Sequence, residues 1–234
     1  MDILTDGLRE LNISYNNEQI DQVNRFYDMI IEKNKVMNLT RITDKREFIE
    51  KHILDSLLVY KIDNISNKRI MDVGTGAGFP GIPVKIFFPN TDMVLLDSLN
   101  KRLVFLDEVI KELKLNNIAT VHGRAEELGH DKKFRESFDI VFSRAVADLS
   151  VLSELCIPFV KVNGYFISYK SADTDEEVLK AENAINILSG SRAEIFNVTI
   201  PNSEISRRFV KIKKKRSNQK IYPRKPGTPA RYPL

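Results

Sequence analysis

The chain has 234 residues, a formal net charge of +4 and 42% hydrophobic residues, which is enough for one substantial core with a small appendage. It begins Met1-Asp2 without the basic and then apolar stretch of a signal sequence, and no apolar run approaches the length of a membrane span. The single cysteine, Cys156, excludes an internal disulfide and stands in no metal-binding motif. We therefore expect a cytoplasmic protein with no membrane partner and no metal.

The first sixty residues are expected to be helical, because apolar residues recur there at helical spacing. A capping-box pattern, Asp44 to Glu47, separates two apolar stripes. The stripes are Ile20, Val23, Tyr27, Ile30 and Ile31, followed by Ile49, Ile53, Leu57 and Tyr60. This pattern predicts an N-terminal helical cap over residues 1–64.

From Arg69 onward, runs typical of strands alternate with helical stretches, which predicts a parallel, doubly wound sheet in a main α/β domain over residues 65–213. Residues 192–199 and 206–213 look like two adjacent strands that would close this sheet with an antiparallel hairpin. The other strands are expected near 69–73, 92–97, 118–122, 138–143 and 164–169, and the helices near 80–88, 99–114, 148–159 and 174–188.

A glycine-rich segment, Asp72–Gly81, follows the first expected strand and contains Gly74, Gly76 and Gly78. Glycine is needed where the backbone takes positive φ or approaches a ligand closely, and the following helix N-terminus presents its amides there. Asp97 ends the next expected strand, 23 residues after Gly74, where a carboxylate accepts hydrogen bonds from ribose hydroxyls. The two features together predict a nucleotide-like cofactor.

The spacing of these glycines indicates which cofactor the loop holds. Dinucleotide folds use G-x-G-x-x-G, whereas Gly74, Gly76 and Gly78 give G-x-G-x-G after Asp72. This pattern resembles the first motif of class I S-adenosylmethionine-dependent methyltransferases. An isolated match would fit an ordinary glycine-rich turn as well as a cofactor-binding loop. Because Asp97 is also in place, we favour the cofactor-binding loop.

Polar residues follow several expected strands, at the edge where ligands bind in such sheets. Arg124-Ala125-Glu126 follows the third strand, Ser143-Arg144-Ala145 ends the fourth, and Lys170 ends the fifth. Strand ends are commonly polar, so each segment alone indicates little. Their convergence with the glycine loop predicts one site.

The C-terminal end of the chain is strongly basic. Residues 206–234 contain eleven lysines and arginines and no acid, so the rest of the chain carries a charge of −7 (+4 minus +11). Such a segment is either a solvated tail or a phosphate-binding surface. We assign residues 214–234 to a basic C-terminal tail.

Taken together, these motifs are similar to those of the bacterial ribosomal RNA small-subunit methyltransferase G family, also called glucose-inhibited division protein B. The resemblance runs from about Asn38 onward, with one departure at Ser171, where the family often has glycine. The matching segments are Asn38-Leu39-Thr40, His52-Ile53-Leu54-Asp55-Ser56, the loop through Phe79-Pro80-Gly81, Leu95-Leu96-Asp97-Ser98, Lys101-Arg102, Arg124-Ala125-Glu126, Ser143-Arg144-Ala145 and Pro223-Arg224-Lys225-Pro226-Gly227-Thr228-Pro229.

The resemblance implies a Rossmann-like class I fold and methylation of guanine N7 at one position in 16S ribosomal RNA, with S-adenosylmethionine as donor. It implies cofactor contacts at Gly74, Phe79, Ala125, Glu126 and Arg144, to which the loop argument adds Asp72, Gly76, Gly78 and Asp97. We expect the RNA, naked or in the small-subunit particle, to contact Asn38, His52, Lys170, Lys213, Lys214, Lys215, Arg216, Arg224 and Lys225.

Guanine N7 carries a lone pair and no proton, so attack on a methyl sulfonium needs positioning and desolvation rather than a base. We therefore expect Arg144 to position the reactants. Other target atoms fit less well: Cys156 follows Leu155 rather than the proline of cytosine-C5 enzymes, and Ser143-Arg144-Ala145-Val146 is no Asn/Asp-Pro-Pro-aromatic motif.

Several alternatives stay open. His52, Asp55 and Ser56 have the composition of a hydrolase triad, but their spacing places them on one helical face, unlike serine hydrolases. A methyltransferase for a protein or small molecule, an RNA-binding module without turnover, and a dehydrogenase are the other candidates. The sequence does not tell the nucleotide that is modified, the form of the RNA substrate or the oligomeric state.

Overall fold

A seven-stranded sheet in the order β3-β2-β1-β4-β5-β7-β6 organises the computed structural model, which describes residues 2–171 and 174–234. β1 to β5 run parallel to one another, and β7 runs antiparallel between β5 and β6. This confirms the predicted doubly wound sheet and its terminal hairpin. The strands are β1 (Arg69–Val73), β2 (Asp92–Asp97), β3 (Ile118–His122), β4 (Phe138–Arg144), β5 (Val160–Lys170), β6 (Glu194–Thr199) and β7 (Ser206–Lys213).

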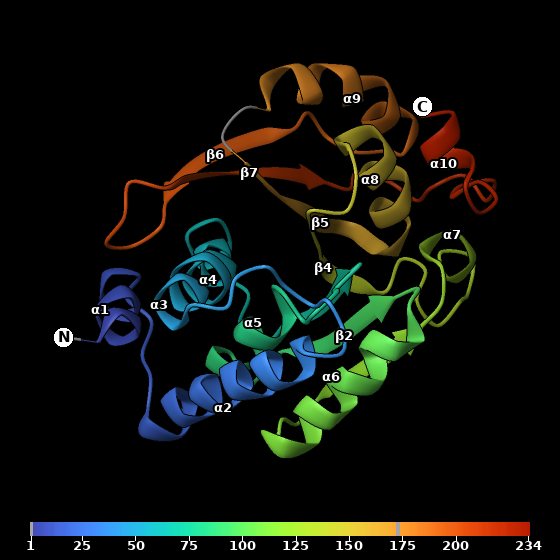
Figure 1. The fold of residues 1–234 in the computed structure, drawn as a ribbon. Helices are drawn as coiled ribbons and strands as arrows, with labels where there is room; N and C mark the ends of the chain where they lie inside the picture. The colour runs from blue at the N-terminus through green and yellow to red at the C-terminus, as the bar shows by residue number, and fades with distance from the viewer. Residues whose placement is uncertain (1, 172–173) are drawn as a thin grey trace.

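Helices cover both faces of the sheet (Figure 1). α2 (Asn17–Asn34), α5 (Gly81–Phe87) and α6 (Asn100–Glu112) pack on one face, while α8 (Leu149–Cys156) and α9 (Asp175–Ile187) pack on the other. Successive side chains of a strand point to opposite faces, so Ile70 joins the first core and Met71 the second. Both faces are therefore apolar, which explains the nearly continuous apolar runs in the sequence. Within the described residues, no helix is long and apolar enough to cross a membrane.

The N-terminal helices share their core with the sheet. The remaining ones are α1 (Ile3–Glu10), α3 (Lys45–Phe48), α4 (Asp55–Leu57) and a 3₁₀ turn, η2 (Leu58–Lys61). Phe26 of α2 and Phe48 of α3 both pack against Phe79, with ring centroids 5.4 and 5.7 Å away. The cap predicted over residues 1–64 is thus built onto the wall of the glycine loop.

Between α3 and α4 the chain forms a π-helix, η1 (Ile49–Leu54), where the apolar spacing predicted only regular helix. The amide of Asp55 donates to the carbonyl of Glu50, five residues earlier. Such π turns are rare and often occur at functional sites. This one carries His52 and leads directly into Asp55.

The basic C-terminal segment is folded against the body of the protein, ending in α10 (Thr228–Arg231) beside α8 (Figure 1). Lys214 is 1% exposed and forms a 2.8 Å ion pair with Glu136. Arg224 forms an ion pair of 2.6 Å with Glu154, which is also 1% exposed. Lys214 is therefore buried in an ion pair and is not available to RNA, and the charge of the half-buried Arg224 is paired with Glu154 rather than free for an RNA phosphate.

We expect Glu154→Gln to destabilise the protein by about 3 kcal/mol, because it leaves the Arg224 guanidinium partly buried without its carboxylate. Denaturant unfolding measures the change in the free energy of unfolding. Glu127→Gln, on the exposed surface of α7 (Ala125–Leu128), is the matched control and should change it by less than about 0.5 kcal/mol. Equal stability of the two variants would show that the segment is held by other contacts.

Candidate functional site

A cavity of about 560 Å³ opens at the carboxyl ends of β1, β2 and β4, where ligands bind in sheets of this kind. Its walls come from the glycine loop, the ends of these strands, the start of α7 and the π-helix. The predicted cofactor residues that line it are Gly74, Gly76, Phe79, Asp97, Ala125, Glu126 and Arg144, and His52 also lines it.

The glycine loop has the predicted conformation: φ is +74° at Gly74, +61° at Gly76 and +97° at Gly78. A Cβ at Gly76 would meet no atom nearer than 3.9 Å, so this position faces open space in the cavity wall. A Cβ at Gly78 would instead lie 2.7 Å from Ile82 and 2.8 Å from Leu106. Gly78 does not line the cavity, and its role is close packing of the loop against α5 and α6.

Asp97 is held rigidly in the cavity wall. Its Oδ2 accepts a hydrogen bond from the Gly76 amide at 2.9 Å, and its Oδ1 accepts one from the Leu99 amide at 2.8 Å. A carboxylate offers about four lone-pair sites, so both oxygens can still accept from a ligand. The pairing of a glycine loop with this carboxylate fits the adenosyl part of S-adenosylmethionine.

Asp72 requires a correction, because it lies beneath the loop and does not line the cavity. Its buried Oδ2 accepts hydrogen bonds from the Thr75 hydroxyl at 2.8 Å and the Gly81 amide at 3.0 Å. Burial raises the pKa of this carboxyl to about 6, although both hydrogen bonds oppose the rise. We therefore assign Asp72 to holding the loop rather than to touching the cofactor.

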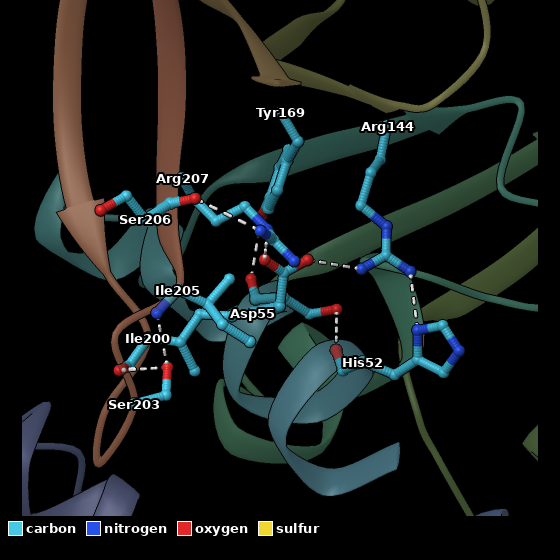
Figure 2. A network of polar contacts seen from close by, with 10 residues as sticks. His52, Asp55, Arg144, Tyr169, Ile200, Ser203, Ile205, Ser206 and Arg207 are labelled. Carbon is cyan, nitrogen blue, oxygen red and sulfur yellow. Dashed lines mark hydrogen bonds and ion pairs between the residues drawn. The ribbon is translucent and has the colours of Figure 1, made fainter. Parts of the chain in front are cut away.

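Three side chains from different parts of the chain meet on the cap side of the cavity. The His52 ring stacks on Phe79, with centroids 4.3 Å apart and planes 17° apart. The Arg144 guanidinium lies 5.2 Å from the centre of the same Phe79 ring and 3.5 Å from His52 Nδ1. Figure 2 shows Arg144 reaching down from β4 toward His52 and toward Asp55. The three side chains form one packed aromatic and cationic cluster at the cavity wall.

His52 is uncharged at neutral pH. Burial, with the nearby Arg144 charge, lowers its pKa to about 3. Its Nε2 lies 2.8 Å from the hydroxyl of Thr40. Ser56 donates its hydroxyl to the His52 backbone carbonyl, at 2.5 Å, rather than to the ring. These contacts do not form a hydrolase triad, because the serine is not hydrogen-bonded to a base.

The predicted RNA residues fall into different places. Asn38 is exposed, next to the cavity-lining Leu39. Lys170, predicted as a phosphate contact, pairs with Glu177 at 2.5 Å and donates to the Ala147 carbonyl at 3.1 Å. Lys225 is exposed, close to the backbone amide of Gly227 that donates to Glu126.

The run Lys213 to Arg216 lies away from the cavity. β7 is antiparallel to β5, so Lys213 pairs with Tyr165 while Arg208 pairs with Lys170. The end of β7 therefore lies toward the amino-terminal edge of the parallel strands, opposite the cavity. Lys215 and Arg216 are exposed, but they lie far from the cavity.

Other cavity-lining residues were missed as site residues. Thr75 and Ala77 lie between the predicted glycines, so their position in the loop could have indicated them. Arg102, on α6, comes five residues after Asp97 at the end of β2, so its position could have indicated it too. Leu39, Val146 and Leu155 carry no chemical signal in the sequence. Nothing but the fold brings them together. Among the described residues, no group of side chains could hold a metal ion.

Solved structures share this fold at low sequence identity. A predicted O-methyltransferase from Agrobacterium tumefaciens matches with a TM-score of 0.54 and 18% identity, over 71% of this chain and 81% of that one. A SAM-dependent methyltransferase from Aquifex aeolicus matches with a TM-score of 0.52 and 16% identity, over 72% and 93%. M. jannaschii TYW2 in complex with AdoMet matches with a TM-score of 0.54 and 15% identity, over 74% and 79%. The fold is that of class I S-adenosylmethionine-dependent methyltransferases.

Sequence comparison defines the family. The profile described as rRNA small subunit methyltransferase G matches residues 19–206. Ribosomal RNA small subunit methyltransferase G of Lachnoclostridium phytofermentans is 48% identical over 97% of this chain and 95% of its own. The protein of the same name from Acetivibrio thermocellus is also 48% identical, over 99% and 96%. The chain belongs to the rRNA small subunit methyltransferase G family and is a methyltransferase that uses S-adenosylmethionine.

Proposed function

We propose that this enzyme transfers a methyl group from S-adenosylmethionine to N7 of a guanine in 16S ribosomal RNA, in the cytoplasm. Membership of the family supports this substrate. The observation that carries the choice of atom is the aromatic and cationic surface of Phe79, His52 and Arg144, in which no side chain is arranged as a base. Guanine N7 is nucleophilic without losing a proton, so such a surface is sufficient.

Different residues of the cavity are assigned to the methyl donor and to the guanine. We assign the adenosyl part of the donor to Asp97 and the loop at Gly76, together with Ala125 and Glu126, which also line the cavity. When bound, S-adenosylmethionine supplies an electrophilic methyl group on a sulfonium. Phe79 and Arg144 then orient the guanine and keep water out of the line of attack.

The rate of methyl transfer should be nearly constant between about pH 6.5 and 8.5, where an ordinary histidine or thiol base would titrate. His52 stays neutral throughout this range because its pKa lies near 3. Burial raises the pKa of Cys156 far above the range. Single-turnover rates with saturating donor and RNA are the measurement. A tenfold rise per pH unit that disappears in His52→Gln would make His52 a base and contradict this mechanism.

The exposed Lys225 is the basic residue of the C-terminal segment that we expect to contact RNA phosphate. Lys225→Ala should weaken RNA binding and reduce the slope of log K against log salt by up to about 0.9. Lys215→Ala, at the opposite edge of the sheet, is the matched control and should leave the slope unchanged. A larger effect of Lys215 would place the RNA on the other edge.

The substrate class is tested with labelled donor and three acceptors: small-subunit particles, their deproteinised RNA, and their proteins. Label in RNA supports the proposal, and the better acceptor of the first two shows the physiological form. Label in the protein fraction alone would establish the alternative of a protein methyltransferase.

A further inference from the structure

A buried carboxylate beside the cavity is shared by two arginines. Asp55 is 5% exposed, and its Oδ2 lies 2.7 Å from Arg144 Nη1. Its other oxygen, Oδ1, lies 2.6 Å from Arg207 Nε on β7. In Figure 2, Asp55 stands between the two guanidinium groups, one from β4 and one from the β6–β7 hairpin. Asp55 does not line the cavity, so its effect on the reaction must pass through Arg144.

Asp55 is itself fixed by the backbone on both sides. Its amide donates across the π turn to the Glu50 carbonyl. The next residue, Ser56, offers its carbonyl to the hydroxyl of Tyr169 at 2.9 Å. Tyr169 is buried on β5 and pairs in register with Arg144 on β4. The helix that carries Asp55 is therefore hydrogen-bonded to β5 at the residue that pairs with Arg144.

Without this carboxylate, the Arg144 side chain would lose its strongest partner. Arg144 is 16% exposed at its side chain and Arg207 27%, so both charges are largely withdrawn from water. Removing the anion between them would leave two like charges in a partly buried space, which favours their separation. Arg144 would then leave its place beside Phe79 and His52.

We propose that Asp55 is a positioning residue for methyl transfer, which sets the place of the Arg144 guanidinium in the cavity and links it to the β6–β7 hairpin through Arg207. The effect on transfer rests on the proposed function. The effect on the geometry of Arg144 does not, so the two can be tested separately.

The test compares Asp55→Asn with Asp63→Asn. Asp63 pairs with Lys211 at 2.8 Å and so ties the same cap to the same strand β7, without touching Arg144. Asp55→Asn should slow single-turnover methyl transfer about 100-fold, the size of effect that a misplacement of about 1 Å produces. Its affinity for S-adenosylmethionine should change less than threefold, and Asp63→Asn should transfer at the wild-type rate. The second readout is the NMR signal of the Arg144 Nη1 hydrogens, which donate to Asp55 and should lose their protection from solvent exchange in Asp55→Asn only.

An unchanged transfer rate in Asp55→Asn, or an equal fall in Asp63→Asn, would overturn the proposal. A protected Arg144 signal in Asp55→Asn would overturn it as well. If the wild-type protein methylates no RNA, the proposed function fails, and the Arg144 signal still decides the geometry. Where Asp55→Asn does not fold, Asp55→Glu moves the carboxylate by one methylene and should slow transfer in the same way; a wild-type rate in that variant would count against the proposal.

Discussion

Gly76→Val should remove S-adenosylmethionine binding while the protein stays folded. Gly76 lines the cavity, and a Cβ there meets no protein atom within 3.9 Å, so the added side chain enters the space that we assign to the donor. The positive φ of +61° should cost about 1–2 kcal/mol of stability. Calorimetry should show affinity reduced more than about 100-fold, a loss of about 2.8 kcal/mol.

Gly78→Val is the contrasting variant on the same loop. Its Cβ would lie 2.7 Å from Ile82 and 2.8 Å from Leu106, so it should unfold the protein at lower denaturant than Gly76→Val. Wild-type donor affinity in folded Gly76→Val would remove the cofactor from this loop.

Arg144→Ala should slow methyl transfer by about 100- to 1000-fold, with little dependence on pH. The substitution removes the cation from the Phe79 face and leaves Asp55 with Arg207 alone. We expect most of the loss in the single-turnover rate, because Arg144 orients the reactants. Arg144→Lys keeps the charge but loses the fork that reaches Asp55 and His52 together, so it should recover only a small part of the rate. A wild-type rate in either variant would exclude this role.

The sheet was predictable because its signals are local. The central strands β1, β2 and β4 are largely apolar runs, and the glycines of the loop stand where φ is positive, at Gly74, Gly76 and Gly78. Asp97 was predictable as well, since a carboxylate at the end of β2 has a fixed place relative to that loop. These features depend on neighbours in sequence rather than on distant contacts.

The π-helix and the ion-pair partners of the C-terminal lysines and arginines were not predictable in the same way. A helical repeat of apolar residues is common to α and π turns, so nothing local marked Ile49–Leu54. The run of lysines and arginines showed the net charge of the C-terminal segment, but it did not show which acids these residues pair with. Lys214 and Arg224 meet Glu136 and Glu154, acids that lie about 70 to 80 residues earlier in the chain.

The site was partly predictable for a similar reason. Arg144 was expected at the cavity from its place at the end of β4, and His52 from the motif that carries it. The link between them depends on Asp55, whose partners Arg144 and Arg207 come from two other elements of the chain. Spacing in the sequence does not show such a link.

Methyl transfer to guanine N7 requires a nitrogen lone pair at that position, so replacing this single atom with carbon should abolish methylation. We would transcribe 16S ribosomal RNA with 7-deazaguanosine in place of guanosine and incubate it with the enzyme and labelled S-adenosylmethionine. Ordinary transcript should accept the label and release it as 7-methylguanine, whereas the 7-deaza transcript, which has carbon at that position, should accept none. Equal labelling of the two transcripts would show that the methyl group goes to another atom.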